Sequence, residues 1–300
     1  MNEECYMEQS YRCGFVALVG RPNVGKSTLM NHLIGQKVSI TSKKAQTTRH
    51  KVNGVYTSEI AQIIFVDTPG FQMKHLNPMN ERLNQNVLDT MPSVDVVVLV
   101  IEAGKFTEED LVIYERLPAN VPIICVVNKF DKIKNKALLE LFISHIEKKY
   151  QFKHIITVSA KHGHHLNDLM DLIPTMLPES PALYPEDMLT DKSSRFLASE
   201  IIREKIFRYL GEELPYSVNV EIKHFTEEEN LYRIYASILT ERDGQKGILI
   251  GKKGEKLKKI GTDARKDMEH LFDKKVYLKL VVKVKTGWSS DIRFLNDLGM

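Results

Sequence analysis

Short apolar runs recur between residues 15 and 158 and are the clearest structural signal in the chain. Each is four or five residues long, which is typical of strands buried inside a sheet. The runs are Phe15–Val19, Ile63–Val66, Ile123–Val127 and His154–Val158. Two helical patterns, at Lys26–Ile34 and Leu166–Met176, separate or follow these runs. Strands alternating with helices predict an α/β domain with a mostly parallel sheet.

The pattern changes after a segment in which three prolines fall within eight residues, Pro178 to Pro185. Proline-rich spacing with little periodicity is typical of a stiff linker. An amphipathic helix is predicted over Ser194–Leu210, followed by strands at Tyr216–Ile222 and Leu231–Leu239. A long helix to about Phe272 and a strand at Val276–Val284 close the chain. We predict three parts: residues 1–178, a linker at 179–192, and an α+β domain at 193–300.

A phosphate loop follows the first predicted strand: Gly20-Arg-Pro-Asn-Val-Gly-Lys-Ser-Thr28 matches G-x-x-x-x-G-K-[ST]. In such a loop the backbone N–H groups at a helix N-terminus surround the phosphates of a nucleotide. Lys26 is expected to reach the β- and γ-phosphates, and the Ser27 hydroxyl to ligate Mg²⁺. Asn23, Val24, Gly25 and Thr28 complete the predicted phosphate contacts.

Two further stretches are predicted to complete the Mg²⁺ and γ-phosphate contacts. Asp67-Thr-Pro-Gly70 ends the second strand, so that Asp67 can hold Mg²⁺ and the Gly70 N–H can bond the γ-phosphate. Ser42–Arg49 has no hydrophobic periodicity and is predicted to be a switch loop that becomes ordered with the nucleotide. One of its threonines, Thr47 or Thr48, should join the Mg²⁺ shell, and Thr48 is favoured.

The base is predicted to be read by Asn128-Lys-Phe-Asp131 and Ser159-Ala-Lys161, each of which follows a strand. The Asp131 carboxylate can accept from both N1–H and the N2 amino group of guanine, whereas adenine has no such pair of donors. Asn128 should tie this loop to the phosphate loop, while the stem of Lys129 can cover the base plane. Ala160 lies in the tripeptide whose backbone N–H groups would face guanine O6. The five motifs together predict a GTPase.

The C-terminal part contains a second glycine loop, Gly251-Lys-Lys-Gly254, between two helical patterns. The order of its helices and strands is that of a prokaryotic-type (type II) KH domain, in which a G-x-x-G loop clamps about four nucleotides. Six lysines and one acid, Glu255, lie between Lys246 and Lys259, a local charge of +5. Such a cluster is typical of a nucleic-acid backbone site. The predicted RNA-binding residues are Ile250, Gly251, Lys252, Lys253, Gly254, Lys256 and Lys259.

The motif set resembles the Era family of bacterial GTPases, through Gly-Arg-Pro-Asn-Val-Gly-Lys-Ser, Gln-Thr-Thr-Arg-His and Asp-Thr-Pro-Gly. The likeness extends from about residue 14 to the end. It implies a Ras-like P-loop GTPase domain with helices on both faces of the sheet, followed by a type II KH domain. It also implies that the RNA is the 3′ end of 16S ribosomal RNA and that the protein acts in assembly of the small (30S) subunit.

Two positions bear on the hydrolysis mechanism that the family implies. Phe71 stands where Ras-like GTPases carry the glutamine that orients the attacking water, so this chain must position water by other means. Asn23 matches a position at which related GTPases hold K⁺ near the bridging phosphate oxygens. Potassium activation is therefore a hypothesis that depends on one asparagine. The GTP-bound state is expected to order Ser42–Arg49 and Phe71–Asn80.

Composition narrows the remaining choices. A net charge of +3 is small, so RNA affinity should come from local patches. Three cysteines form no disulfide framework, and Met1-Asn-Glu-Glu-Cys5 lacks the apolar stretch of a signal peptide. The apolar run Asp95–Ile101 is too short to span a bilayer. We expect a cytoplasmic monomer, with peripheral contact at the inner membrane surface implied by the family.

Two alternative functions stay open at this point. The chain could be mainly a membrane-associated cell-cycle switch for which RNA binding is secondary. It could also be a passive RNA-binding module that uses GTP only as a structural ligand. An ATPase is disfavoured, because Asp131 matches the donors of guanine and not those of adenine.

Overall fold

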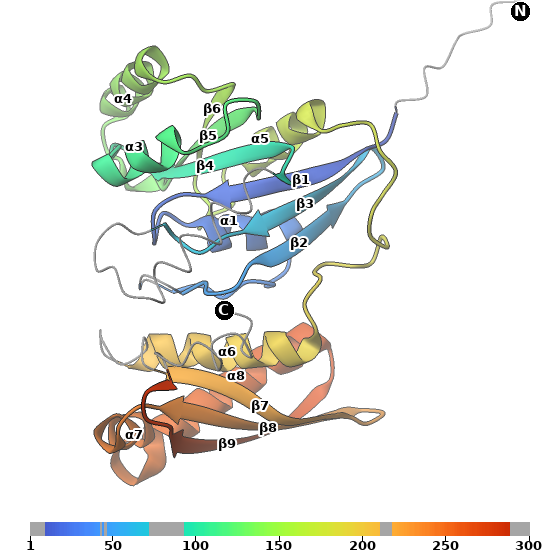
Figure 1. Ribbon diagram of the computed structural model, residues 1–300, viewed down its shortest axis with the longest axis vertical. Helices are drawn as coiled ribbons and strands as arrows, with labels where there is room; N and C mark the ends of the chain where they lie inside the picture. The colour runs from blue at the N-terminus through green and yellow to red at the C-terminus, as the bar shows by residue number, and fades with distance from the viewer. Residues whose placement is uncertain (1–9, 43, 45–46, 72–92, 211–217, 289–300) are drawn as a thin grey trace, which may run out of the picture.

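The structure, a computed structural model, describes residues 10–42, 44, 47–71, 93–210 and 218–288. Figure 1 shows two sheets, each with its own helices, joined by an extended segment between α5 and α6. The larger sheet has six strands in the order β2-β3-β1-β4-β5-β6, and the smaller has three in the order β7-β8-β9. The predicted fold class, an α/β nucleotide-binding domain followed by an α+β domain, is confirmed.

The first domain is an α/β sheet in which only the edge strand β2 runs antiparallel. Its elements are β1 (Arg12–Val19), α1 (Lys26–Ile34), β2 (Val52–Thr57), β3 (Ala61–Asp67), β4 (Val96–Glu102), α3 (Glu108–Glu115), β5 (Ile123–Asn128), α4 (Lys136–Lys149), β6 (His154–Val158) and α5 (Leu166–Leu172), with short 3₁₀ turns at Phe130–Lys132 and Ile173–Met176. The strands predicted from apolar runs are all present. No strand was predicted at β2, where a central glycine interrupts the apolar pattern, or at β4, whose apolar run was considered only as a membrane span.

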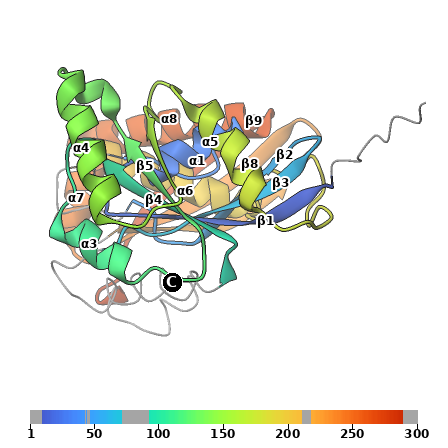
Figure 2. The same ribbon diagram turned by 90° about the horizontal axis from the view of Figure 1, so that it is seen from above.

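Helices cover both faces of this sheet (Figure 2). Because side chains alternate along a strand, β1 sends Val16 and Leu18 to one face and Ala17 and Val19 to the other. The first pair packs in the core beneath α1 and α5, and the second in the core beneath α3 and α4. Because β1, β3 and β5 run parallel, they end at the same edge of the sheet, and the loops that carry the predicted motifs begin there.

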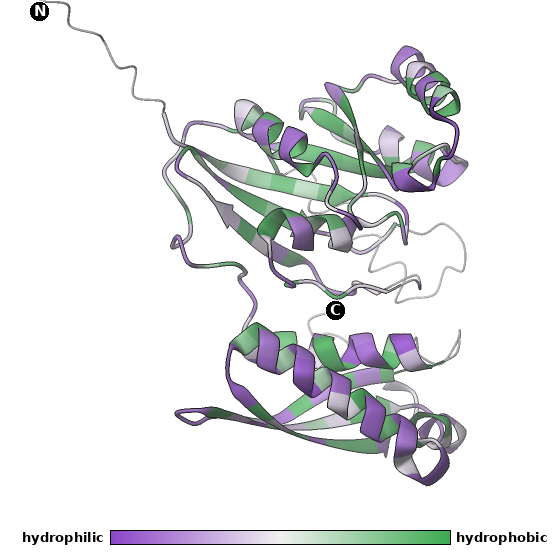
Figure 3. Cartoon of the chain, turned by 180° about the vertical axis from the view of Figure 1, so that it is seen from behind, coloured by the Kyte–Doolittle hydropathy of each residue, from purple (hydrophilic) through white to green (hydrophobic). Residues whose placement is uncertain are grey.

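The second domain places helices on one face of a three-stranded sheet. Its elements are α6 (Ser194–Tyr209), β7 (Val218–Glu227), β8 (Leu231–Thr240), α7 (Asp243–Ile250), a 3₁₀ turn at Lys252–Gly254, α8 (Glu255–Phe272) and β9 (Lys275–Val284). Hydrophilic and hydrophobic residues alternate around α8 (Figure 3), as expected for a helix with one buried face. Trp288, the only tryptophan of the chain, follows β9 and is fully buried.

Helix α6 departs from the amphipathic pattern that the sequence predicts. Every residue from Glu200 to Phe207 is buried, including four charged ones. One face packs in the core of the second domain, while the other lies toward the first domain (Figure 1). A charged helix face that reads as solvated in the sequence is thus an interdomain surface.

The proline-rich segment is fastened to the first domain along its length. Gln62 of β3 accepts from the backbone N–H groups of Leu183 and Tyr184 at 2.8 and 2.9 Å, and donates to the Tyr184 carbonyl at 2.8 Å. Near its end, the Leu189 carbonyl accepts from Val55 N–H at 2.9 Å. The predicted stiffness therefore comes from these bonds as well as from proline. The exact domain limits, 178 and 193, stay a prediction.

No helix among the described residues is both long enough and apolar enough to cross a bilayer.

Candidate nucleotide and RNA-binding sites

The phosphate loop connects β1 to α1 and needs its two glycines for different reasons. Both have positive φ, 147° at Gly20 and 110° at Gly25. A Cβ on Gly20 would lie 2.3 Å from the Val100 carbonyl oxygen, and one on Gly25 would lie 2.3 Å from the Asn128 amide nitrogen. No side chain caps the first turn of α1, which begins directly after Gly25. Its free N–H groups therefore form the anion site that the motif predicts.

Lys26 closes over this loop from the first residue of α1. Its side chain is only 6% exposed, and Nζ donates to the carbonyls of Gly20 and Arg21 at 2.9 and 3.0 Å. Burial lowers the pKa of Lys26 to about 8, although the nearby Asp67 carboxylate opposes that shift. An ammonium held by backbone carbonyls beside the free N–H groups of the first turn of α1 is complementary to a polyphosphate, whose charge would replace the missing solvation.

Three of the predicted metal ligands meet at one carboxylate oxygen. Ser27 Oγ donates to Asp67 Oδ2 at 2.7 Å, and Thr48 Oγ1 lies 3.0 Å from Ser27 Oγ and 3.4 Å from that oxygen. Ser39 Oγ, which the sequence analysis missed, also donates to Asp67 Oδ2, at 2.8 Å. Thr47 is turned away, since its hydroxyl pairs with Ser42 Oγ at 2.6 Å and with the Lys44 carbonyl at 2.8 Å. Of the two threonines offered by the sequence, Thr48 is the one at the site.

The donor set at Asp67 fits Mg²⁺. Asp67 is fully buried, and its Oδ1 has no hydrogen-bond partner within the described part of the chain. Burial raises the pKa of this carboxyl, and the hydroxyls of Ser27, Ser39 and Thr48 oppose the shift. Mg²⁺ prefers hard oxygen ligands and retains several waters, so Ser27, Thr48 and Asp67 would hold it between protein and phosphate. When bound, the ion would neutralise charge on the phosphate oxygens.

Gly70 brings its backbone against the phosphate loop, and neither Gly70 nor Phe71 offers a polar side chain there. A Cβ on Gly70 would lie 2.8 Å from the backbone of Pro22, so only glycine fits there. Phe71 is buried, and the Arg116 guanidinium carbon lies 5.0 Å from the centroid of its ring. Phe71 thus packs in the hydrophobic core, and its side chain has no polar group that could orient a water. The predicted ordering of Phe71–Asn80 falls mostly on residues 72–80, which lie outside the described ranges.

Asn128 joins three loops at the sheet edge, as the sequence predicts for its link to the phosphate loop. Its Nδ2 donates to the Val24 carbonyl at 2.7 Å. Its Oδ1 accepts from the backbone N–H groups of Lys129 and Ala160, at 2.8 and 2.9 Å. One buried amide therefore fixes the phosphate loop, the Asn-Lys-Phe-Asp loop and the Ser-Ala-Lys loop relative to one another.

Asp131 is held by the Ser-Ala-Lys loop, in the position that the sequence predicts for base recognition. Ser159 Oγ donates to its Oδ1 at 2.6 Å, and this hydrogen bond is the main cause of a lowered Asp131 pKa. An ionised acceptor is what guanine N1–H and N2–H₂ require. Lys129 Nζ donates to the Asn23 carbonyl at 2.6 Å and to Glu102 Oε2 at 2.8 Å, which holds its stem across the mouth of the three loops. Glu102 carries no motif signature, and the sequence analysis missed it. Lys161 is exposed beside this mouth.

The second glycine loop lies between α7 and α8 at the exposed end of the smaller domain. Gly251, Lys253 and Gly254 all have positive φ, at 72°, 51° and 78°. A Cβ on Gly251 would lie 2.8 Å from Cβ of Lys256, so this position is closed to other residues. Lys252 and Lys253 are exposed, and Lys259 Nζ lies 4.7 Å from the centroid of the Tyr209 ring. The loop geometry supports the predicted backbone clamp, with Ile250 half-buried at its start.

A hollow beside this loop adds residues that sequence reasoning did not name. It runs between α8 and β9, with apolar walls and cations at its rim. Its lining includes Leu257, Lys258, Gly261, Arg265 and Leu280. Lys258 is one of the six lysines counted between Lys246 and Lys259, and a charge count extended to Arg265 would have found the second cation.

The fold and these two sites define a P-loop GTPase with an appended KH domain. The family model for a 50S ribosome-binding GTPase matches residues 15–129, and the KH-domain model matches residues 213–289. The GTPase Era of Neisseria meningitidis serogroup A is 61% identical over 97% of this chain and 95% of its own length. That of Chromobacterium violaceum is 57% identical over 97% of this chain and 98% of its own length.

The chain belongs to the GTPase Era family, and it binds and hydrolyses GTP. Solved Era structures agree in fold. A variant Era from Aquifex aeolicus bound to GDP·AlF4⁻ matches with a TM-score of 0.91 and 40% identity, over 95% of this chain and 98% of that one. An Era in complex with MgGDPNP and nucleotides 1506–1542 of 16S ribosomal RNA matches with a TM-score of 0.90 and 40% identity, with the same coverage.

Proposed function

We propose that this GTPase binds the 3′ end of 16S ribosomal RNA through Gly251–Gly254 and acts in assembly of the 30S subunit. The observation that supports this most is the exposed Gly-Lys-Lys-Gly loop, whose positive-φ backbone can approach phosphates closely. An Era at 40% identity has been crystallised with nucleotides 1506–1542 of that RNA. The chain's small net charge assigns the affinity to this loop and the cations near it.

The test is the affinity for a 3′-terminal 16S segment, measured with GDPNP, with GDP and without nucleotide. A scrambled RNA serves as the sequence control. The variant Lys252→Asp/Lys253→Asp reverses both loop charges and should weaken binding by about a hundredfold. Lys148→Asp/Lys149→Asp on α4 is the matched control, because it makes the same charge change on two exposed lysines of the other domain. Equal losses in both variants would reduce the interaction to non-specific charge attraction.

We further propose that the nucleotide site holds Mg²⁺ through Ser27, Thr48 and Asp67, and that K⁺ binds near Asn23. Asn23 has a φ of 63°, and Lys129 covers its carbonyl. A cation there would lie beside the bridging phosphate oxygens. Turnover in KCl should exceed that in NaCl at equal ionic strength, and the Asn23→Ala variant should lose the difference. Equal rates in the two salts would contradict the K⁺ site.

A cytoplasmic monomer with peripheral membrane contact is the remaining part of the proposal. Cys13 and Cys125 are free thiols buried in the first domain, as a reducing compartment would allow. Liposome flotation after nuclease treatment tests the contact. Membrane binding that survives the nuclease would favour the alternative of a membrane-associated switch, whereas loss of binding would make RNA the link.

A further inference from the structure

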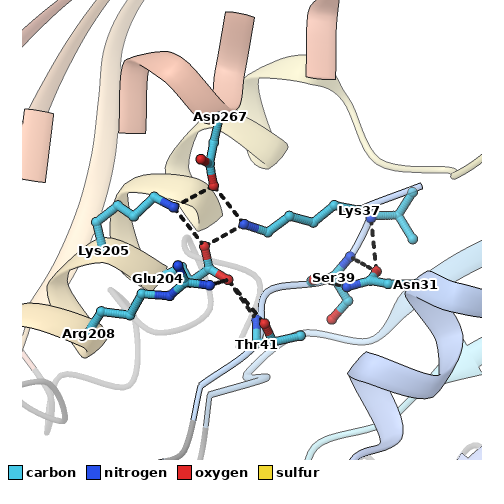
Figure 4. Close-up of polar contacts among 9 residues, drawn as sticks. Asn31, Lys37, Ser39, Thr41, Glu204, Lys205, Arg208 and Asp267 are labelled. Carbon is cyan, nitrogen blue, oxygen red and sulfur yellow. Dashed lines mark hydrogen bonds and ion pairs between the residues drawn. The ribbon is translucent and has the colours of Figure 1, made fainter. Parts of the chain in front are cut away.

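Two consecutive residues of α6, Arg203 and Glu204, project from the KH domain into the nucleotide-binding domain. Their side chains carry opposite charges and are almost completely buried, with 2% and 0% exposure. Both contact the switch segment, defined here as the described residues between Lys37 and Arg49. Figure 4 shows Glu204 of α6 facing Lys37 and Thr41 of this segment. Buried charges normally require a specific set of partners, and here part of that set comes from the other domain: Lys37 and Thr41 for Glu204, and the Thr47 carbonyl for Arg203.

Glu204 holds the first part of the switch segment. Its Oε1 accepts from the Thr41 backbone N–H at 3.2 Å and from the Thr41 hydroxyl at 3.3 Å. Its Oε2 lies 2.5 Å from Lys37 Nζ, which also pairs with Asp267 of α8 at 2.8 Å. The segment is thus fixed to two helices of the KH domain at residues 37 and 41.

The residues between these two anchors reach the metal site. Asn31 Oδ1 accepts from the backbone N–H groups of Val38 and Ser39 at 3.0 and 2.9 Å, on the side opposite Glu204 (Figure 4). Ser39 Oγ then donates to Asp67 Oδ2. Ser39 lies only two residues before Thr41. A shift of Thr41 away from α6 would therefore also move the Ser39 hydroxyl that contacts the Asp67 carboxylate.

Arg203 holds the last part of the same segment. Its guanidinium pairs with Glu200 through Nε at 2.7 Å and Nη2 at 2.6 Å, and Nη2 also donates to the Thr47 carbonyl. The next residue is Thr48, whose hydroxyl lies at Ser27 and Asp67. Arg49 continues the contact by donating to the Val218 carbonyl of β7 at 3.1 Å. The peptide that carries the Thr48 hydroxyl is therefore oriented from the KH domain.

We propose that Arg203 and Glu204 are positioning residues for the Mg²⁺ site, which set the Thr48 and Ser39 hydroxyls around Asp67 from the KH domain. The inference depends on Mg²⁺ binding at Ser27, Thr48 and Asp67. Docking of α6 would then favour the nucleotide that needs this Mg²⁺ geometry, a triphosphate, over the diphosphate. Because coupling of binding free energies is reciprocal, the triphosphate would hold α6 in place to the same degree.

The test compares affinities for GDPNP and GDP across Mg²⁺ concentrations in Arg203→Met and Glu204→Leu, which remove the polar groups and keep most of the volume. We expect the preference for GDPNP over GDP to fall about tenfold and the Mg²⁺ midpoint to rise by a similar factor, since a hydrogen bond to a charged group is lost. The affinity for GDP without Mg²⁺ should stay within about twofold, because the phosphate loop makes no contact with α6 that these variants remove. Parallel losses for both nucleotides would overturn the proposal.

Arg208→Met is the matched control. Arg208 donates to the same Glu204 Oε1 at 3.2 Å, but its side chain is 49% exposed and it approaches from within α6. Its removal should leave the GDPNP preference unchanged. A tenfold loss in this variant as well would show that the effect reflects α6 in general and not the contacts to Thr41 and Thr47, and would count against the proposal.

A second readout needs no nucleotide, and milder variants are available if the first ones do not fold. Amide hydrogen exchange of Thr41 should become faster in Glu204→Leu, because that N–H loses its acceptor. If either variant fails to fold, Arg203→Lys and Ser39→Ala are the milder substitutions. Arg203→Lys should retain part of the GDPNP preference, and Ser39→Ala should lose part of it. No change in any of these quantities would overturn the proposed positioning role.

Discussion

The two glycine loops of this protein lie in opposite environments. Gly20–Thr28 and Gly251–Gly254 both contain positive-φ glycines and lysine, the residue types that a backbone phosphate site requires. Lys26 is 6% exposed and bonded to the carbonyls of its own loop, whereas Lys252 and Lys253 point into solvent. The lysine is thus buried in the loop of the first domain, called the enclosed loop below, whereas the lysines are exposed in the loop of the second, called the open loop.

The difference teaches what burial adds to a phosphate site. A buried cation acts in a low dielectric and is fixed in place before the ligand arrives, so its removal is costly and specific. Exposed lysines act through a screened field, and their contribution falls with salt. We therefore expect the enclosed loop to determine which ligand binds, and the open loop to determine how tightly a backbone is held.

The largest effect should follow from changing the predicted base acceptor of the nucleotide site. Asp131→Asn replaces a carboxylate that faces two guanine donors with an amide that matches xanthine. The preference for GTP over XTP should change by roughly 10⁴-fold, because a site built for those donors rejects a base without them. Competition binding with fluorescent GTP measures it. An unchanged GTP affinity would remove Asp131 from base recognition.

Lys26→Ala should be the next most damaging. It removes the ammonium that faces the β- and γ-phosphates, and turnover should fall by roughly 10²- to 10³-fold. Single-turnover hydrolysis followed by phosphate release gives the rate. Lys148→Ala, on the exposed surface of α4, is the control and should leave the rate unchanged. A loss below about threefold in Lys26→Ala would contradict the contrast between the two loops.

The contribution of the open loop, Gly251–Gly254, should be measurable in the salt dependence of RNA affinity. Each phosphate neutralised on a single strand contributes about 0.7 to the slope of log affinity against log salt. Lys252→Ala should lower the RNA slope by about that amount and the RNA affinity by about tenfold at low salt. GDP affinity should change little over the same salt range. An RNA slope identical in wild type and variant would mean that Lys252 contacts no phosphate.

The smallest predicted effect is the uptake of part of a proton by Lys26 when GDP binds. Without nucleotide, burial lowers the pKa of Lys26 to about 8, so between pH 8 and its ordinary value of 10.5 this lysine is mostly neutral. A bound diphosphate raises that pKa again, so GDP binding at pH 8.5 should take up a fraction of a proton and GDP affinity should fall as pH rises through 8. Calorimetry in buffers of different ionisation enthalpy measures the uptake, which should fall to about a tenth of a proton at pH 7. Equal values at both pH values would place Lys26 in a solvated site.

The sequence predicted most of the enclosed site because its residues lie in short motifs. Asp67 and Asn128 end the strands β3 and β5, and Lys26 and Ser27 begin the helix that the phosphate loop joins to β1. Parallel strands bring their carboxyl ends to one edge of the sheet. Phosphate-loop spacing alone therefore fixes much of the geometry. Contacts that depend on residues far apart in the chain were missed, as with Ser39 at Asp67 and Glu102 at Lys129.

The interdomain surface lay beyond sequence reasoning for a different reason. Glu200, Arg203 and Glu204 are spaced like charges on a solvated helix face, and nothing local reveals the opposite domain that buries them. Strand β2 was also missed, because Gly54 breaks its apolar pattern. That glycine leaves room for α1, since a Cβ there would lie 2.1 Å from Cδ1 of Ile34 and would make that side chain shift.

The single tryptophan has a practical consequence. Trp288 is the only indole in the chain and is fully buried at the end of the KH domain. Its ultraviolet emission therefore reports on that domain alone, while a fluorescent guanine nucleotide reports on the other. The wild-type protein therefore carries its own energy-transfer donor, and a bound fluorescent guanine nucleotide supplies the acceptor, so the polypeptide itself needs no label. The separation of the two domains during a GTP cycle can thus be followed in real time in the unmodified polypeptide.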